Sequence, residues 1–183
     1  GNVEKNGLFE QRLEAVNYQQ PPYSTAYPKL VNYFETNPSL PQRNFIENNV
    51  FESSGSAILI PGDANGWYES GAVKDVTIRN NIFNDPCLTS LYQFCEAVIS
   101  IYPEIPKPDV AKPFHRNIRI EHNTFHPFDY PVLYAKSTEG LYFNNNTIIR
   151  STRFQPFHYR KYMFSFEYCK KVEISNNSMQ GDV

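Results

Sequence analysis

The chain has 183 residues, a length that fits one domain. Its 17 Lys and Arg nearly balance its 19 Asp and Glu, so charge gives no reason to expect a nucleic-acid or membrane partner. No run of 18 apolar residues is present, so no membrane-spanning helix is predicted. The three cysteines lack the spacing of a metal site or of a disulfide scaffold. We expect three packed thiols, with a Cys87–Cys95 bridge across one loop as the alternative.

The first 42 residues differ in kind from the rest of the chain. They are rich in proline and tyrosine, as in QQPPYSTAYP and NPSLPQ. We expect an irregular segment that caps the fold, packs along it as a loop, or is the remainder of a truncated turn. The sequence therefore divides into this segment, 1–42, and a region of repeating β-structure, 43–183.

From residue 43 onward, a short strand, an asparagine pair and a second short strand recur five times. The copies are RNFIENNVF at 43–51, KDVTIRNNIF at 74–83, RNIRIEHNTF at 116–125, EGLYFNNNTII at 139–149 and KKVEISNNSM at 170–179. Apolar and polar residues alternate before each pair, which is the period of a half-buried strand, and Ile78 is assigned to the inner face. A further set of apolar strands lies between the copies, at 57–60, 97–102, 132–135 and 163–168.

The spacing of these copies predicts a solenoid. The second asparagines stand at 49, 81, 123, 146 and 177, so the intervals are 32, 42, 23 and 31 residues. The shortest is close to one turn of a parallel β-solenoid, and the longer ones correspond to a turn plus a loop. We predict an all-β fold, a right-handed parallel β-helix of roughly five turns with two to three strands per turn and inserted loops. An antiparallel β-sandwich is the alternative, but the hairpin signals that it needs are scarce.

The asparagines have a physical reason in such a fold. A sharp corner between strands often places one residue at positive φ, which asparagine tolerates better than most residues with a side chain. Where turns stack, asparagine lies above asparagine, so the amides can hydrogen-bond along the stack as a ladder. His122 replaces the first asparagine of its pair and is interpreted as a corner residue.

Four insertions interrupt the repeat. They are 61–73, 84–95, 103–115 and 150–162. In solenoids, function commonly lies on insertions and on one exposed sheet. The first three border the apolar strands between the copies, so we expect them to rise on neighbouring turns and to form one wall.

The stretch GDANGWYESG at 62–71 concentrates candidate binding residues. It contains Asp63, Asn65, the only tryptophan, Trp67, and Glu69. An indole face stacks on the C–H face of a sugar ring, while carboxylates and amides bond its hydroxyls. The alternative is a glycine-rich loop whose tryptophan covers an exposed edge of the solenoid.

Other polar residues are weaker candidates. Glu96 and Glu104 flank the strand in CEAVISIYPEIP and could face the same groove, or they are ordinary surface carboxylates. Arg153, His158 and Arg160 could bind an anion or a sugar, although a solvated basic loop is the simpler interpretation. The histidines show neither HxH nor HExxH spacing, so we predict no metal site and no cofactor.

Carboxylate spacing allows glycosidase chemistry. Such enzymes commonly use two carboxylates, about 6.5–9.5 Å apart when inverting and about 5–5.5 Å apart when retaining. Adjacent turns of a β-helix are about 4.8 Å apart, so carboxylates one or two turns apart fit either case. Asp63 or Glu69 together with Glu96 or Glu104 could form such a pair.

The stretch GDANGWYESGAVKDVTIRNNIF at 62–83, followed by EAVISIYPEI at 96–105, resembles glycoside hydrolase family 110. These proteins are bacterial α-1,3-galactosidases, some of which act on blood-group B and linear α-galactosyl ends. The resemblance runs from about residue 43 to 150. It implies a right-handed parallel β-helix, inverting and metal-independent hydrolysis of terminal α-galactosides, and a secreted or periplasmic protein. It also implies that Asp63, Asn65, Trp67 and Glu69 face the sugar groove.

The chain departs from the pattern of that family in one respect. The catalytic residues proposed for the family are aspartates on earlier turns, including an adjacent pair, whereas this chain has no Asp-Asp and no aspartate within 1–42. The catalytic residues are therefore left unassigned, and we expect a C-terminal part of the β-helix that is inactive by itself.

Two other classes of function remain open on the sequence. The first is a non-catalytic β-helix that binds glycans or caps an assembly, and the second is a pectate-lyase-like enzyme, which would need clustered aspartates for Ca²⁺. For the α-galactosidase-like protein and for the glycan-binding β-helix alike, the expected partner is a carbohydrate carrying terminal α-galactosides. Neither nucleic acid nor a membrane is expected. Exposed solenoid ends also favour end-to-end self-association.

Overall fold

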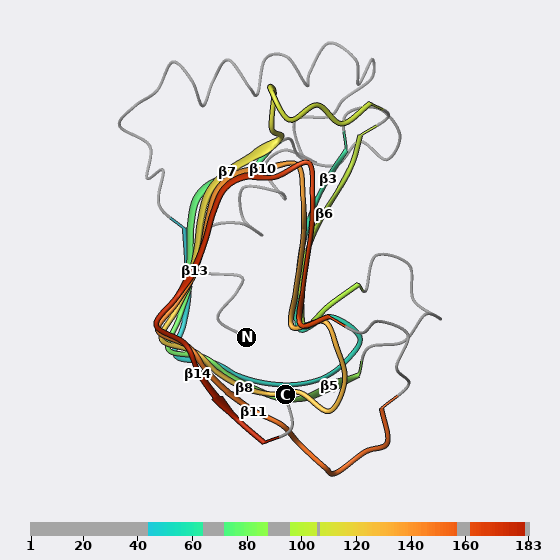
Figure 1. Cartoon of the computed structure of the whole chain (residues 1–183), viewed down its shortest axis with the longest axis vertical. Coiled ribbons are helices and arrows are strands. Elements are labelled where there is room, and N and C mark those ends of the chain that lie inside the picture. The colour runs from blue at the N-terminus through green and yellow to red at the C-terminus, as the bar shows by residue number, and fades with distance from the viewer. Residues whose placement is uncertain (1–43, 64–71, 88–95, 106, 157–161, 182–183) are drawn as a thin grey trace, which may run out of the picture.

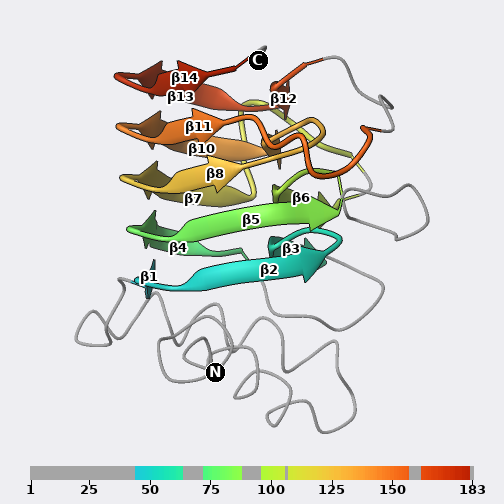
Figure 2. The ribbon, with the colours of Figure 1, turned by 90° about the horizontal axis from the view of Figure 1, so that it is seen from below.

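The computed structural model describes residues 44–63, 72–87, 96–105, 107–156 and 162–181, and these form fourteen β-strands. The expected N-terminal segment, 1–42, lies outside the described residues. The strands fall into three sheets of parallel strands, which lie around one axis while successive turns stack along it (Figures 1 and 2). The prediction of an all-β parallel solenoid is confirmed.

Within each sheet, neighbouring strands come from successive turns of the helix. Sheet A contains β1 (Asn44–Glu47), β4 (Lys74–Arg79), β7 (His115–Glu121), β10 (Thr138–Asn144) and β13 (Lys170–Ser175). Sheet B contains β2 (Val50–Ser54), β5 (Ile82–Cys87), β8 (Thr124–His126), β11 (Thr147–Ile149) and β14 (Ser178–Gln180). Sheet C contains β3 (Ile58–Asp63), β6 (Ile99–Glu104), β9 (Leu133–Lys136) and β12 (Phe164–Glu167).

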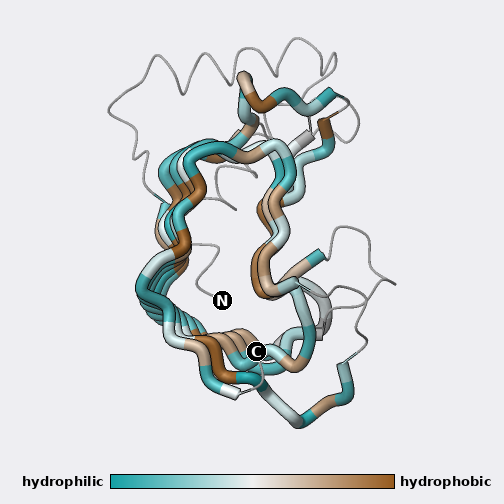
Figure 3. Tube along the Cα trace, in the orientation of Figure 1, coloured by the Kyte–Doolittle hydropathy of each residue, from teal (hydrophilic) through white to brown (hydrophobic). Residues whose placement is uncertain are grey.

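The chain passes from sheet A to B to C and then back to A, one turn further on. In Figure 1 this path runs anticlockwise, and the later turns lie nearer the viewer, so the helix is right-handed. The three strands of each turn enclose a core that runs along the axis (Figure 3).

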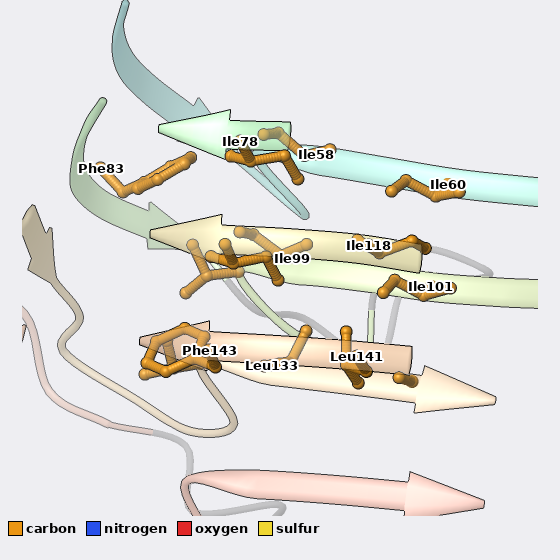
Figure 4. Close-up of a cluster of buried hydrophobic side chains, with 14 of the residues drawn as sticks. Ile58, Ile60, Ile78, Phe83, Ile99, Ile101, Ile118, Leu133, Leu141 and Phe143 are labelled. Carbon is orange, nitrogen blue, oxygen red and sulfur yellow. The ribbon is translucent and has the colours of Figure 1, made fainter. Parts of the chain in front are cut away.

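The core is built from the inward-facing residue of each alternating pair. In sheet A, Ile46, Ile78, Ile120 and Phe143 are in register on successive strands, and all are buried. In sheet B the rings of Phe83 and Phe125 stack with centroids 4.6 Å apart. Figure 4 shows how side chains from sheets A, B and C meet in this interior. Because each inner position is repeated one turn later, burial continues along the axis from turn to turn. It ends at the last turn, where the inward residues Val172, Ile174 and Met179 are 36–49% exposed.

The two residues of each asparagine pair have different tasks. The first position, at the corner between sheets A and B, has φ between 54° and 59° in all five copies. His122 occupies it with φ 57°, as expected for a corner residue. The second position points inward, and its side chain bonds to the next turn. We call these second residues, Asn49, Asn81, Asn123, Asn146 and Asn177, the amide column.

The amide column follows one pattern of hydrogen bonds. Asn81 Nδ2 donates to Asn123 Oδ1 at 3.0 Å, and Asn123 Nδ2 donates to Asn146 Oδ1 at 3.1 Å. Each amide also donates to a backbone carbonyl, as Asn123 Nδ2 does to Ile78 O at 2.9 Å. These buried polar groups are therefore satisfied by one another, as burial requires.

The insertions do not form the single wall that we expected from the sequence. The insertions 61–73 and 103–115 follow β3 and β6, so both leave the corner between sheets C and A. The insertion 84–95 begins within β5 and precedes β6, so it belongs to the other corner, between sheets B and C, as does 150–162. The prediction grouped loops by sequence neighbourhood, whereas the corner from which each loop leaves is set by which strand precedes it.

Candidate functional site

The outer face of sheet C lies between these two corners and carries aromatic, acidic and basic side chains. Alternation sends Leu133 and Ala135 into the core and leaves Tyr134 and Lys136 on the outer side of β9. The parallel register then sets Lys136 opposite Glu167 of β12 and Tyr134 opposite Ser100 of β6. Residues that are distant in sequence thus become neighbours on one surface.

Tyr134 is the centre of this face. Its side chain is only 2% exposed, although it points away from the core, and its ring stacks on Tyr102 with centroids 5.6 Å apart. Its phenol donates a hydrogen bond to the Glu167 carboxylate. Burial, followed by that hydrogen bond and the negative charge of Glu167, raises the pKa of Tyr134 far above its usual range. Tyr134 is therefore a neutral, fixed donor that orients Glu167.

Lys136 gives the same face a positive charge. Its Nζ lies 5.2 Å from the centroid of the Tyr102 ring, within the range of a cation–π interaction. Glu167 and Lys136 thus stand on adjacent strands, with Tyr102 and Tyr134 beside them. This mixture of flat rings, hydrogen-bond donors and acceptors suits an uncharged ligand rich in hydroxyl groups.

Glu96 borders this face at the corner between sheets B and C. The backbone N–H groups of Glu96 and Ala97 donate to Ser100 Oγ at 3.0 and 2.9 Å, which fixes the bend that leads into β6. Ser100 is fully buried, and its hydroxyl also pairs with Ser56 Oγ at 2.8 Å. The negative charge of Glu96 makes a small contribution to the raised pKa of Tyr134.

Asp63 and Glu104 lie at the opposite end of the face. They are paired in register as the last residues of β3 and β6. Neighbouring strands are about 4.8 Å apart, so these two acidic positions are brought together, one turn apart. The other predicted binding residues, Asn65, Trp67 and Glu69, lie outside the described residues, and their assignment stays a prediction.

Four residues of the face were not identified from the sequence. They are Tyr102, Tyr134, Lys136 and Glu167. Their only signal in the sequence is that they occupy outward-facing positions of the apolar strands between the copies. Aligning those strands by their inward residues would have placed all four on one surface.

His115 lies beneath the corner between sheets C and A. It is fully buried, and its Nδ1 accepts a hydrogen bond from Val73 N at 3.1 Å, so Nε2 carries the proton. Among the described residues Nε2 has no hydrogen-bond partner. Burial lowers the pKa of His115 to about 3, because no group there compensates for the loss of hydration. His115 is therefore neutral in the folded protein and has a structural role.

No group of three or more His, Cys, Asp and Glu side chains in the described part of the chain is arranged to hold a metal ion. Nor do these residues include a helix that is long and apolar enough to cross a membrane.

The fold and this face together define a class, a right-handed parallel β-helix with one aromatic and charged sheet face. No model of a known protein family matches the chain. It is 67% identical over 145 residues to alpha-1,3-galactosidase B of Bacteroides thetaiotaomicron, a match that covers 79% of this chain and 24% of the relative. It is 49% identical over 143 residues to alpha-1,3-galactosidase A of Bacteroides fragilis, covering 78% of this chain and 23% of the relative.

The chain is homologous to one part of bacterial α-1,3-galactosidases, and the resemblance noted in the sequence is confirmed at that level. It spans about a quarter of the length of these curated relatives.

Proposed function

We propose that this chain is part of a glycoside hydrolase that removes terminal α-1,3-linked galactose, and that the outer face of sheet C is part of its sugar groove. The observation that carries the proposal is the 67% identity to an α-1,3-galactosidase over 145 residues. The outer face of sheet C agrees with it, because that face combines stacked tyrosines with glutamates and a lysine. Rings of this kind pack against the C–H face of a pyranose, and the charged groups bond its hydroxyls.

The carboxylates of the face meet the general needs of glycoside hydrolysis. In the inverting reaction, one carboxylic acid gives a proton to the leaving oxygen as the glycosidic bond breaks. A carboxylate on the other side takes a proton from the water that forms the new bond. Asp63 and Glu104 stand one turn apart, while Glu96 and Glu167 belong to turns separated by β9. We assign these residues to sugar binding and leave the acid and base unassigned.

We further propose that the amide column is the repeating device that holds the turns in register beneath this groove. A slip of one residue would send every outer residue of a strand to the core. The amides bond only at one register, because Asn123 must reach Asn146 on one side and Asn81 on the other. The groove then keeps its side chains in fixed positions along the axis.

We also propose that the protein is secreted or periplasmic, since glycans with terminal α-galactose lie outside the bacterial cytoplasm. Cell fractionation of the source organism tests this directly. Recovery of the protein in the cytoplasmic fraction alone contradicts it.

The experiment that tests the function measures galactose released from an α-1,3-linked galactosyl disaccharide. It uses this chain and a version extended toward its natural N-terminus, and the matched variants Glu104→Gln and Glu173→Gln, the latter on the outer face of sheet A. Release that falls with Glu104→Gln but not with Glu173→Gln supports the proposal. Binding of the disaccharide without release in either version supports a glycan-binding module instead, and neither binding nor release refutes the proposal.

A further inference from the structure

Asp85 occupies an irregular position at the corner between sheets B and C. Between the register pairs Glu52–Asn84 and Ser54–Cys87, β5 has one residue more than β2, so β5 forms a bulge at Asp85 and Pro86. Asp85 has φ 41°, a left-handed conformation that costs free energy for a residue other than glycine. Bulges of this kind redirect side chains and are frequent beside functional sites.

The carboxylate that this bulge presents is incompletely satisfied. The Asp85 side chain is 14% exposed, and its buried Oδ1 has no hydrogen-bond partner among the described residues. Oδ2 meets Arg153 Nη1 at 3.5 Å, but the arginine side chain is 68% exposed. An exposed ion pair contributes little to stability. This pair alone is therefore a weak reason to hold a strained, mostly buried carboxylate in place.

An exposed aromatic ring stands beside this pair. Phe154 is 49% exposed, and the Arg153 guanidinium lies 5.2 Å from its ring centroid. The Phe154 ring also meets Phe128, which is 3% exposed, edge-on with centroids 5.5 Å apart. Phe128 therefore packs against Phe154, about half of which stays exposed to solvent.

Resting on the proposed galactosidase function, we propose that Asp85, Arg153 and Phe154 form a second saccharide subsite, separate from the face of sheet C. A carboxylate and a guanidinium provide acceptors and donors for hydroxyl groups, and a phenyl face packs against a pyranose ring. A hydroxyl that approaches beside Arg153 can donate to the accessible part of the Asp85 carboxylate, whose side chain is 14% exposed.

The place of the subsite in the fold indicates which sugar it binds. Asp85 lies on the strand that leads into Glu96 and β6, and Phe154 lies between β11 and β12, so both border the edge where the strands of sheet C begin. The six residues of β6 span about 20 Å, which exceeds the length of one sugar ring. The terminal galactose occupies the face of sheet C, and the subsite takes a sugar further along the same chain.

Calorimetric titration with galactose, an α-1,3-galactosyl disaccharide and a trisaccharide that extends it tests this assignment. The experiment uses the version of the protein that binds galactose. We expect the third sugar to improve affinity about tenfold, which corresponds to about 1.4 kcal/mol. Asp85→Asn and Phe154→Ala should each remove that gain and leave the affinity for galactose unchanged.

Matched controls lie on the outer face of sheet A. Glu121→Gln removes a carboxylate and Tyr142→Ala removes an aromatic ring there, and both should retain the gain from the third sugar. Phe154→Ala leaves the carboxylate in place, so it gives an answer even if Asp85→Asn fails to fold. Two results overturn the subsite alone. In the first, the protein binds galactose but the third sugar does not improve affinity. In the second, the third sugar improves affinity as much in both subsite variants as in the parent. A wild-type protein that binds no galactoside overturns the proposed function and the subsite with it.

Discussion

Replacing Asn123 by alanine should show how much the amide column contributes to stability. The Asn123 side chain is 1% exposed and makes four hydrogen bonds. Its Nδ2 donates to Ile78 O and Asn146 Oδ1, and its Oδ1 accepts from the backbone N and the Nδ2 of Asn81 at 3.0 Å each. At about 1 kcal/mol for each bond, Asn123→Ala should lower the free energy of unfolding by about 4 kcal/mol. The backbone N–H of Asn81 also loses its acceptor while buried, which adds to the cost.

Asn49→Ala is the matched control, because Asn49 lies in the first turn of the column. Its side chain donates two hydrogen bonds, to Glu47 O and Asn81 Oδ1, and is only partly buried. We expect a loss of about 1–2 kcal/mol there. Equilibrium urea unfolding followed by circular dichroism gives both values. Equal losses in the two variants would refute the reasoning that internal amides stabilise the stack through their number of buried hydrogen bonds.

Three further predictions concern the core and the corner between sheets C and A. Since His115 has a pKa of about 3 in the folded protein and 6.5 when unfolded, stability should be lost as pH falls between these values. The free energy of unfolding should be about 2 kcal/mol lower near pH 5 than above pH 7. Urea unfolding of His115→Gln should not show this decrease. Ile78→Asp should unfold the chain because it charges a fully buried position, whereas Ile82→Asp, at a position that is 40% exposed, should keep the circular dichroism of the parent. A Cβ at Gly62 would collide with Phe114, so Gly62→Ala should cost about 1–3 kcal/mol, and adding Phe114→Leu should recover part of it in thermal melts.

The sequence was a good guide wherever the signal is local. Alternation places Val76 and Ile78 inward whatever the rest of the chain does, because side chains on a strand alternate between two faces. The intervals between asparagine pairs favour parallel stacking, since each turn of a parallel helix returns the chain to the same face. The corner position of His122 follows from the same periodicity.

The candidate site could be predicted only in part. Glu96 and Glu104 were visible because they flank an apolar strand, and the structure places them at opposite ends of one sheet face. The contact between Tyr134 and Glu167 joins turns that are 33 residues apart, and the length of the insertion between them hides their register in the sequence. The pairing of Asp85 with Arg153 spans 68 residues and could not be anticipated from either segment.

The sequence by itself thus determined the fold class, the inward-facing residues and the corners, because each depends on the period of a single strand or turn. Only the tertiary structure decided which loops leave from the same corner and which outer side chains meet. Stacking brings strands about 4.8 Å apart regardless of how many residues separate them along the chain. The neighbours of an outer side chain such as Tyr134 are therefore set by the register between turns, which the inserted loops conceal.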